Sequence, residues 1–365
     1  MIGYMADNGL NLRAEFRDFL LLSTNESRAF ATEIYDHLSR IVGSVNLDNE
    51  ISEGVYEKRM GHVRGTYHND GEPTAQIETN VRRKRVYYVH HFCGPDARFN
   101  VPHGESKLKR VDGAFGRSSP REVTYILPYL PYARSDRSTR ARQPVSVKDF
   151  LRDLRNCDYL LTLDLHDPHI IEYVDHYRII DIYADPVLEQ AVRDLNLQNL
   201  AVVSPDAGGI PRARRFAKRL DAPLAFIDKR RERDGEVEEM HLVGDVRDKT
   251  VLIRDDMIDT AGTFKKAAKH LVDDWGAVDV YGVMTSGIYS ASAVERIRES
   301  GAKIIATNNI PRGPKFLRAN KDWLTQVSPA ELIAQTIHQL HISDGSISGL
   351  QGKTDLIDDT WDPAK

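Results

Sequence analysis

Short apolar runs recur along this chain, each bounded by turn-forming or polar residues, and segments of helical length separate most of them. The runs predict strands at residues 19–23, 86–89, 123–127, 159–163, 201–204, 224–227, 251–253, 279–284 and 303–307. The intervening segments predict helices at residues 26–42, 210–220, 264–275 and 290–300. This alternation is typical of an α/β protein with mainly parallel sheets flanked by helices.

The alternation of strands and helices occurs twice, which predicts two domains in tandem. We place the first at residues 12–180 and the second at residues 181–350, with a weakly ordered tail at 351–365. Two polar, Gly-containing segments, near 43–66 and 94–120, enlarge the first domain as insertions, and the second of them is expected to be a long loop.

Composition narrows the range of functions. With 41% apolar and 28% charged residues over 365 positions, the chain has the make-up of an ordinary globular protein. Its formal net charge of −4 gives no general electrostatic reason to bind nucleic acid or an anionic membrane. No apolar run has the length of a membrane span, and the N-terminal residues lack the pattern of a secretion signal. The two cysteines indicate neither a disulfide framework nor a metal site, so a cytoplasmic enzyme is expected.

The segment VLIRDDMIDTAGT (251–263) carries the strongest chemical signal. An apolar run ends in two adjacent carboxylates, a small-residue turn follows, and a helical pattern begins after it. Such a turn presents backbone N–H groups at a helix N-terminus, which suits a phosphate, while paired carboxylates suit the vicinal hydroxyls of a sugar. We therefore expect a ribose 5-phosphate site, whose residues are Asp255, Asp256, Asp259, Thr260, Ala261, Gly262 and Thr263.

A second turn between a strand and a helix reads Asp206-Ala207-Gly208-Gly209. Its glycines would let the backbone approach a diphosphate closely, although such a turn taken alone is more often a simple helix entry. A third segment places Lys229 and Arg231 at the end of a strand, before a polar stretch with the composition of a mobile loop. Alone, that stretch could equally be a solvated charge run.

Together these motifs resemble the ribose-phosphate pyrophosphokinase family. The resemblance rests on ILPYLPYARSDRSTRARQPVSVK (126–148), LTLDLH (161–166), VVSPDAGGIPRARRFAKRL (202–220), FIDKRR (226–231), GDV (244–246) and DDMIDTAGT (255–263), in the family's order. It implies two tandem phosphoribosyltransferase-type domains and a homo-oligomer, usually a hexamer, with a dimer as the alternative. It also implies Mg²⁺-dependent transfer of the β,γ-diphosphoryl group of ATP to the C1 hydroxyl of ribose 5-phosphate, which releases AMP.

The resemblance also assigns roles to individual residues. It places the metal contacts at His166 and Asp206, and it makes Lys229 and Arg231 the catalytic cations that stabilise charge on the transferring group. ATP contacts are implied for Arg134 and Asp136, and for a loop that reaches a neighbouring subunit in the family. The residues of that loop are His68, Asp70 and Glu72.

The chain departs from the family pattern at several positions. Ser135 and Ser286 stand where the family has Gln and His, and Asn308 stands where it has Asp. These positions keep two alternatives open. One is a related diphosphokinase that acts on another 5-substituted ribose, such as ADP-ribose, and the other is a non-catalytic regulatory paralogue. Retention of both cations and both acids argues against the paralogue.

Overall fold

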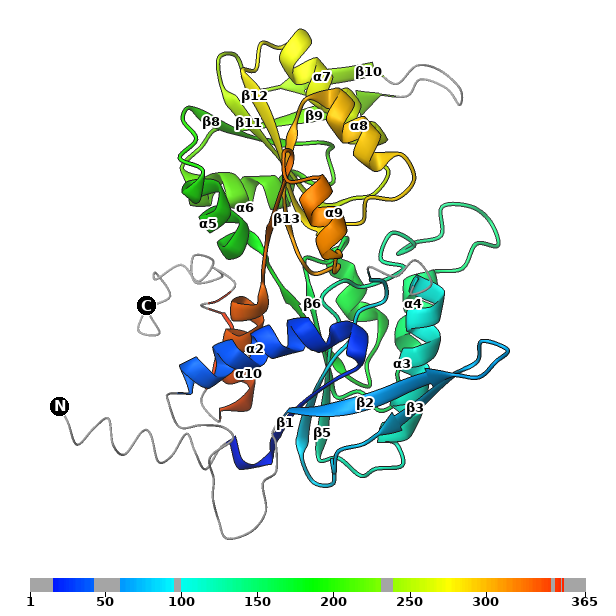
Figure 1. Ribbon diagram of the computed structural model, residues 1–365. Coiled ribbons are helices and arrows are strands. Elements are labelled where there is room, and N and C mark those ends of the chain that lie inside the picture. The colour runs from blue at the N-terminus through cyan, green and yellow to red at the C-terminus, as the bar shows by residue number, and fades with distance from the viewer. Residues whose placement is uncertain are drawn as a thin grey trace, which may run out of the picture. The chain divides into compact units, whose positions relative to one another are not determined.

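The computed structural model describes residues 16–42, 60–94, 100–230, 239–342, 345–348 and 350. The chain divides into two compact units (Figure 1): the first contains Met1–Tyr183 and Ala330–Lys365, and the second contains Ala184–Pro329. The structure differs from the predicted domains at the C-terminal end, because helix α10 (Ala330–His341) packs against α2 (Arg28–Ile41) of the first unit.

The first unit is built on a seven-stranded sheet with the order β3-β2-β1-β4-β5-β6-β7. Its strands are β1 (Phe19–Ser23), β2 (Met60–Tyr67), β3 (Pro73–Ile77), β4 (Arg85–Val89), β5 (Glu122–Ile126), β6 (Tyr159–Leu163) and β7 (Arg178–Ile182). Its other helical segments are η1 (Phe16–Asp18), η2 (Asn25–Ser27), α3 (Val101–Phe115), α4 (Ser146–Arg152) and η3 (Pro168–Tyr173). All neighbouring strands run parallel except β2 and β3, which form an antiparallel hairpin.

The second unit repeats this plan with the order β10-β9-β8-β11-β12-β13-β14. Its strands are β8 (Leu200–Ser204), β9 (Leu224–Arg230), β10 (Glu239–Val243), β11 (Thr250–Ile258), β12 (Asp279–Gly287), β13 (Lys303–Thr307) and β14 (Leu324–Val327). Its helices are α5 (Asp185–Asp194), α6 (Ile210–Leu220), α7 (Gly262–Asp273), α8 (Ala293–Ser300) and α9 (Pro314–Ala319). Here too the only antiparallel pair among the described strands is the outer hairpin, β9 with β10. The predicted α/β class with two mainly parallel sheets is confirmed.

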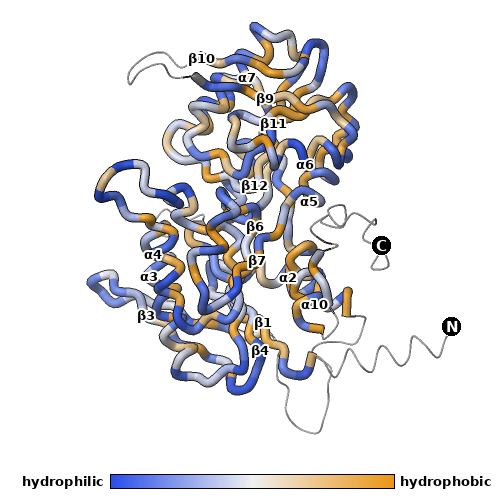
Figure 2. Tube along the Cα trace, turned by 180° about the vertical axis from the view of Figure 1, so that it is seen from behind, coloured by the Kyte–Doolittle hydropathy of each residue, from blue (hydrophilic) through white to orange (hydrophobic). Residues whose placement is uncertain are grey.

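Hydrophobic residues concentrate along the central strands of both sheets, as the orange segments of Figure 2 show. In the second unit they form two clusters, one on each face of the sheet. One joins the sheet to α7 and α8 through residues such as Phe264 and Ile297, and the other joins it to α5 and α6 through Leu188 and Phe216. None of the described helices has the length and apolarity that crossing a bilayer requires.

The predicted long loop at 94–120 is wrong in its middle, where α3 forms. Asn100 caps this helix by accepting a hydrogen bond from the backbone N–H of His103, and a proline occupies the first turn. Leu108, Val111 and Phe115 are buried and lie three and four residues apart, so they form one apolar stripe. Two glycines and several charges within the helix hide this stripe in the sequence.

Candidate functional site

Two carboxylates lie side by side near the end of β11, the central strand that pairs with β8 and β12. The side chain of Asp255 is 29% exposed and that of Asp256 only 4%. The guanidinium of Arg212 on α6 lies 3.7 Å from an oxygen of Asp255 and 3.6 Å from an oxygen of Asp256. Burial, followed by the neighbouring charge of Asp256, raises the pKa of Asp255 well above the usual range of a carboxyl group.

The turn after this strand leads directly into α7. Asp259 is anchored by Ser290, whose hydroxyl donates to its carboxylate and whose backbone N–H donates to its carbonyl at 3.0 Å. Ala261 precedes the helix in a left-handed conformation with φ of 57°. No side chain caps the helix, so the N–H groups of its first turn remain available to an anion. The hydroxyl-bearing Thr260 and Thr263 are exposed beside them.

The predicted diphosphate loop, Asp206–Gly209, lies at the same edge of the sheet, because it follows the adjacent parallel strand β8. Ser204 Oγ donates to the carbonyl of Asp206 at 2.7 Å, and the N–H of Gly209 donates to Asp206 Oδ1 at 2.9 Å. A Cβ at Gly209 would lie 2.7 Å from Ser204 Oγ, so this position favours glycine. Asp206, Ala207 and Gly208 are exposed, which leaves the loop open to a ligand.

The two implied metal contacts belong to different units. His166 follows β6 in the first unit and Asp206 follows β8 in the second, and both side chains are exposed. Within the described ranges, no group of three or more His, Cys, Asp or Glu side chains is arranged to hold a metal ion. An exposed carboxylate nevertheless suits Mg²⁺, which takes oxygen ligands and usually keeps several waters.

Lys229, one of the two predicted catalytic cations, belongs to the hairpin of β9 and β10. Lys229 is half-buried on β9 and pairs with Met240 of β10. Arg231 is the next residue but one, and it lies outside the described residues. The structure therefore places the strand that carries Lys229, and the catalytic assignment of both cations stays a prediction.

The residues expected at the ATP site occupy two loops of the first unit. Arg134 is exposed and Asp136 is buried, in the segment between β5 and α4. The others form the turn of the β2–β3 hairpin, where Asp70 Oδ1 accepts the N–H of Glu72 at 3.0 Å. The three residues predicted to contact ATP from this turn are all exposed: His68, Asp70 and Glu72.

A hollow of about 530 Å³ lies beside this turn. His68 and Glu72 line one side, and Lys109 and Arg110 of α3, with Arg117 just after this helix, line the other. Its cationic wall suits a ligand that carries phosphate groups.

Two arginines near the acid pair of the second unit, Arg212 and Arg254, have no role in the site predicted from the sequence. Arg212 contacts both acids, and Arg254, the residue before them, is fully buried. In the sequence, Arg254 is recognisable as a single cation at the end of an apolar run. Arg212 is recognisable as a cation in the first turn of the helix that follows the glycine loop.

Comparison with known proteins covers nearly all of the described chain. A family model described as the N-terminal domain of ribose phosphate pyrophosphokinase matches residues 19–157. A phosphoribosyl transferase domain matches residues 172–277, and a phosphoribosyl synthetase-associated domain matches residues 233–350.

Individual relatives agree with these family matches. The ribose-phosphate pyrophosphokinase of Gloeobacter violaceus is 39% identical over 285 residues, which are 77% of this chain and 82% of the relative. That of Bacillus subtilis is 35% identical over 82% of this chain and 93% of its own length. A solved phosphoribosylpyrophosphate synthetase from Mycobacterium smegmatis superimposes with a TM-score of 0.70 at 28% identity, covering 89% of this chain and 99% of that one. The chain belongs to the ribose-phosphate pyrophosphokinase family.

Proposed function

We propose that the chain transfers the β,γ-diphosphoryl group of ATP to the C1 hydroxyl of ribose 5-phosphate, giving 5-phosphoribosyl 1-pyrophosphate and AMP for nucleotide synthesis. The observation that carries this proposal is the carboxyl edge of the second sheet. There an acid pair lies near the end of β11, an uncapped helix start follows this strand, and a glycine loop follows the adjacent strand β8. This edge offers hydroxyl acceptors and two separate anion cradles to one small molecule.

The sugar phosphate can be held by both ends. Asp255 and Asp256 would accept hydrogen bonds from the 2- and 3-hydroxyls, and the turn from Asp259 to Thr263 would donate backbone N–H groups to the 5-phosphate. The loop from Asp206 to Gly209 would receive the diphosphate at C1.

The transfer itself requires charge neutralisation more than covalent chemistry. His166 and Asp206 would hold Mg²⁺, which would supply positive charge to neutralise the phosphate groups. Lys229 and Arg231 would add positive charge as the diphosphoryl group leaves AMP. ATP would be held by Arg134 and Asp136 together with the hairpin turn.

We also propose a homo-oligomer in which this turn, with His68, Asp70 and Glu72, completes the ATP site of a neighbouring subunit. The turn is exposed, and the hollow next to it has a cationic wall. A hexamer is the assembly expected from the family, and a dimer is the alternative. The compartment stays a prediction: two cysteines outside any disulfide fit a reducing cytoplasm, while one relative, from Arabidopsis thaliana, is named chloroplastic.

Product analysis tests the proposed reaction. The enzyme is incubated with Mg²⁺ and ATP, in parallel with ribose 5-phosphate and with ADP-ribose, and the nucleotides are separated by chromatography. Stoichiometric AMP with ribose 5-phosphate is expected. ADP as the main product would rule out diphosphoryl transfer, AMP with ADP-ribose alone would identify another acceptor, and no nucleotide turnover would favour a regulatory paralogue.

A further inference from the structure

Arg254 is a cation placed where the fold otherwise uses apolar residues. It directly precedes the acid pair on β11, and its side chain is 0% exposed. The corresponding strand of the first unit is β4, whose last residue, Val89, pairs with Ser23 at the end of β1. In the second unit Ile253 pairs with Val203, one residue before the end of β8, so Arg254 takes the place that Val89 has in the first unit.

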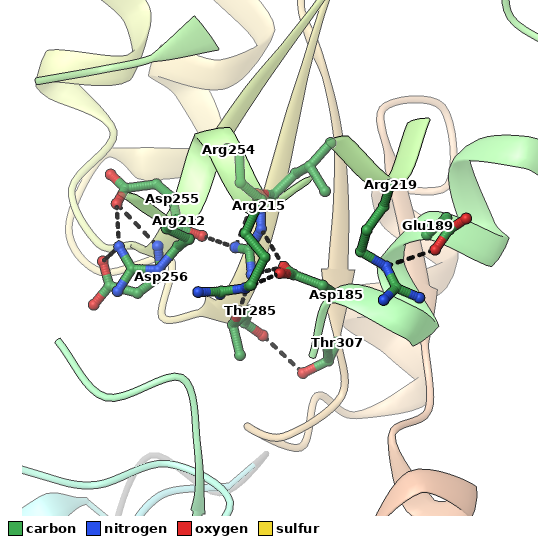
Figure 3. Close-up of polar contacts among 11 residues, drawn as sticks. Asp185, Glu189, Arg212, Arg215, Arg219, Arg254, Asp255, Asp256, Thr285 and Thr307 are labelled. Atoms are coloured by element: carbon green, nitrogen blue, oxygen red, sulfur yellow. Dashed lines mark hydrogen bonds and ion pairs between the residues drawn. The ribbon is translucent and has the colours of Figure 1, made fainter. Parts of the chain in front are cut away.

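The guanidinium is fully engaged in hydrogen bonds (Figure 3). Its Nε and Nη2 donate to Asp185 Oδ1 at 3.1 and 2.9 Å, and Nη2 also donates to Thr285 Oγ1 at 3.2 Å. Nη1 donates to the backbone carbonyl of Asp255 and, at 3.5 Å, to that of Val283. One side chain thus links α5, β11 and β12 directly behind the acids.

The sheet is irregular at this point. Asp255 of β11 lies opposite Met284 of β12, and the register of β12 with its other neighbour, β13, shifts between Met284 and Ser286. Arg254 donates to carbonyls on both strands beside this irregularity, and it therefore supplies hydrogen bonds that fix the backbone from which the acids project.

Stability alone does not account for this arrangement. The carboxylate of Asp185 is 2% exposed, and desolvating such a pair costs about as much as the pairing returns, so well-packed apolar residues are often as good or better. Phe216, a core residue, lies next to the guanidinium, with its ring centre 5.6 Å away. The surroundings could thus accommodate an apolar side chain.

We propose that Arg254, oriented by Asp185, is a positioning residue for the two carboxylates that grip the ribose hydroxyls. The proposal rests on the proposed function for the identity of the sugar. Arg254 does not contact the substrate; it holds the Asp255 backbone so that the two carboxylates keep one geometry. Misplacement of a binding group by about 1 Å can cost roughly 10²-fold in rate, so the effect should be measurable.

The test compares two arginines that share one partner. Arg254→Met removes the cation that contacts both Asp185 and the Asp255 carbonyl. Arg215→Met is the matched control, because Arg215 Nε donates to Asp185 Oδ2 at 2.5 Å from α6. After circular dichroism has established folding, kcat and KM are measured for ribose 5-phosphate and for ATP, and ATP affinity is measured by calorimetry.

We expect Arg254→Met to lower kcat/KM for ribose 5-phosphate by roughly 10- to 100-fold while ATP affinity stays within about twofold. Arg215→Met should change both by less than about threefold. Arg254→Lys, which keeps the charge but cannot reach all four acceptors, should lie between Arg254→Met and wild type. If Arg254→Met does not fold, Arg254→Lys and Asp185→Asn decide the question through the same contrast between the two substrates.

Three results would overturn the proposal: an unchanged kcat/KM for ribose 5-phosphate in a folded Arg254→Met or Arg254→Lys enzyme, an equal loss for both substrates, or an equal effect of Arg215→Met. Failure of the proposed function would look different, because the wild-type enzyme itself would release no AMP with ribose 5-phosphate.

Discussion

At the scale of single residues, the acid pair on β11 sets the pH range in which the sugar can bind. Two carboxylates this close cannot both ionise easily, and Arg212 offsets only part of their repulsion. Burial first, then the charge of Asp256, raise the pKa of Asp255 to about 8. Because a carboxyl group with a raised pKa keeps its proton over a wider range, the pair holds one proton at neutral pH when the site is empty.

Ribose binding should therefore weaken as the pH falls below about 8. The doubly ionised pair offers charged, stronger acceptors to both hydroxyls, so kcat/KM for ribose 5-phosphate should drop by up to about tenfold per pH unit below that value. The measurement is a pH profile of kcat/KM for ribose 5-phosphate, compared with the profile for ATP. Asp255→Asn should lose ribose 5-phosphate binding at every pH while ATP binding largely survives. Identical profiles for the two substrates would contradict the assignment.

Lys229 permits a second test at this scale. A group that acts mainly on charge in the transition state should change kcat far more than KM. We expect Lys229→Ala to lower kcat by roughly 10²-fold. Lys303→Ala is a suitable control, since Lys303 begins β13, away from the carboxyl edge, and pairs with Asp279 at 3.3 Å on the surface. A change confined to KM would mean that Lys229 only binds substrate.

At the scale of elements, apolar runs in the sequence predicted the secondary structure better than polar segments did. Residues 159–163 and 303–307 are strands with the predicted bounds, and 210–220 is a helix with the predicted bounds, because each is buried against a sheet or on several sides. The hairpin of β2 and β3 and helix α3 were not predicted. Part of their stabilising contacts form with distant segments, β2 with β1 and α3 with β3, and glycines and charges obscure the apolar pattern in their own sequences.

The same reasoning applies to the candidate site. Asp255 at the end of an apolar run and Gly209 in a glycine-rich turn could be predicted, because these signals are local and repeat in known motifs. The role of Arg254 could not, because its partners Asp185 and Thr285 are brought to it only by the folded sheet.

Lys107 shows what holds α3 in place. Its side chain is 1% exposed, its ammonium donates to Glu26 Oε1 at 2.6 Å, and it lies 5.2 Å from the ring centre of Tyr67. Burial alone would raise the pKa of Glu26, but hydrogen bonds, including the one from Lys107, lower it overall. The pair thus links α3 to η2 and to the strand that leads into the hairpin turn.

Lys107→Met should destabilise the first unit by about 2 kcal/mol. This is less than the 3–5 kcal/mol typical of a fully buried pair that loses one partner, because Glu26 remains 28% exposed to water. Because the folded-state pKa of Glu26 is depressed, the difference should be full above about pH 4.5 and vanish as the pH falls through the lower folded-state pKa. Urea unfolding at pH 7 and at low pH measures it. Equal stability of variant and wild type at pH 7 would show that the pair contributes nothing.

At the scale of the whole molecule, two units with one strand order carry different chemistry. Where the second unit has Asp255 and Asp256, the first continues from Val89 into His90 and His91, which are buried. Burial lowers the pKa of His90 to about 4 and that of His91 to about 3, so both are neutral near pH 7. Neutral buried imidazoles cannot replace two carboxylates, and we therefore expect one ribose 5-phosphate site per chain, in the second unit.

The proposed ATP contacts raise a separate question, namely whether each ATP site is formed by one chain or by two neighbouring chains. Arg134 and Asp136 lie between β5 and α4, whereas Asp70 and Glu72 lie in the hairpin turn that we propose to serve a neighbouring subunit. In a closed symmetric oligomer every interface is repeated, so a site shared between subunits occurs at each one. Activity should then depend on assembly. Two variants that are inactivated at different ATP contacts should regain activity when their subunits are mixed.

Mixing two inactive variants tests this directly. One carries Asp70→Ala with Glu72→Ala, and the other carries Arg134→Ala with Asp136→Ala. After subunit exchange, verified by native mass spectrometry, some interfaces will join an intact turn to an intact loop, and their AMP production should return. Statistical mixing of equal amounts in a dimer with two shared sites restores one site in each mixed dimer, about a quarter of all sites. Continued inactivity despite demonstrated exchange would mean that each chain carries its own complete ATP site, and that the hairpin turn serves only the subunit to which it belongs.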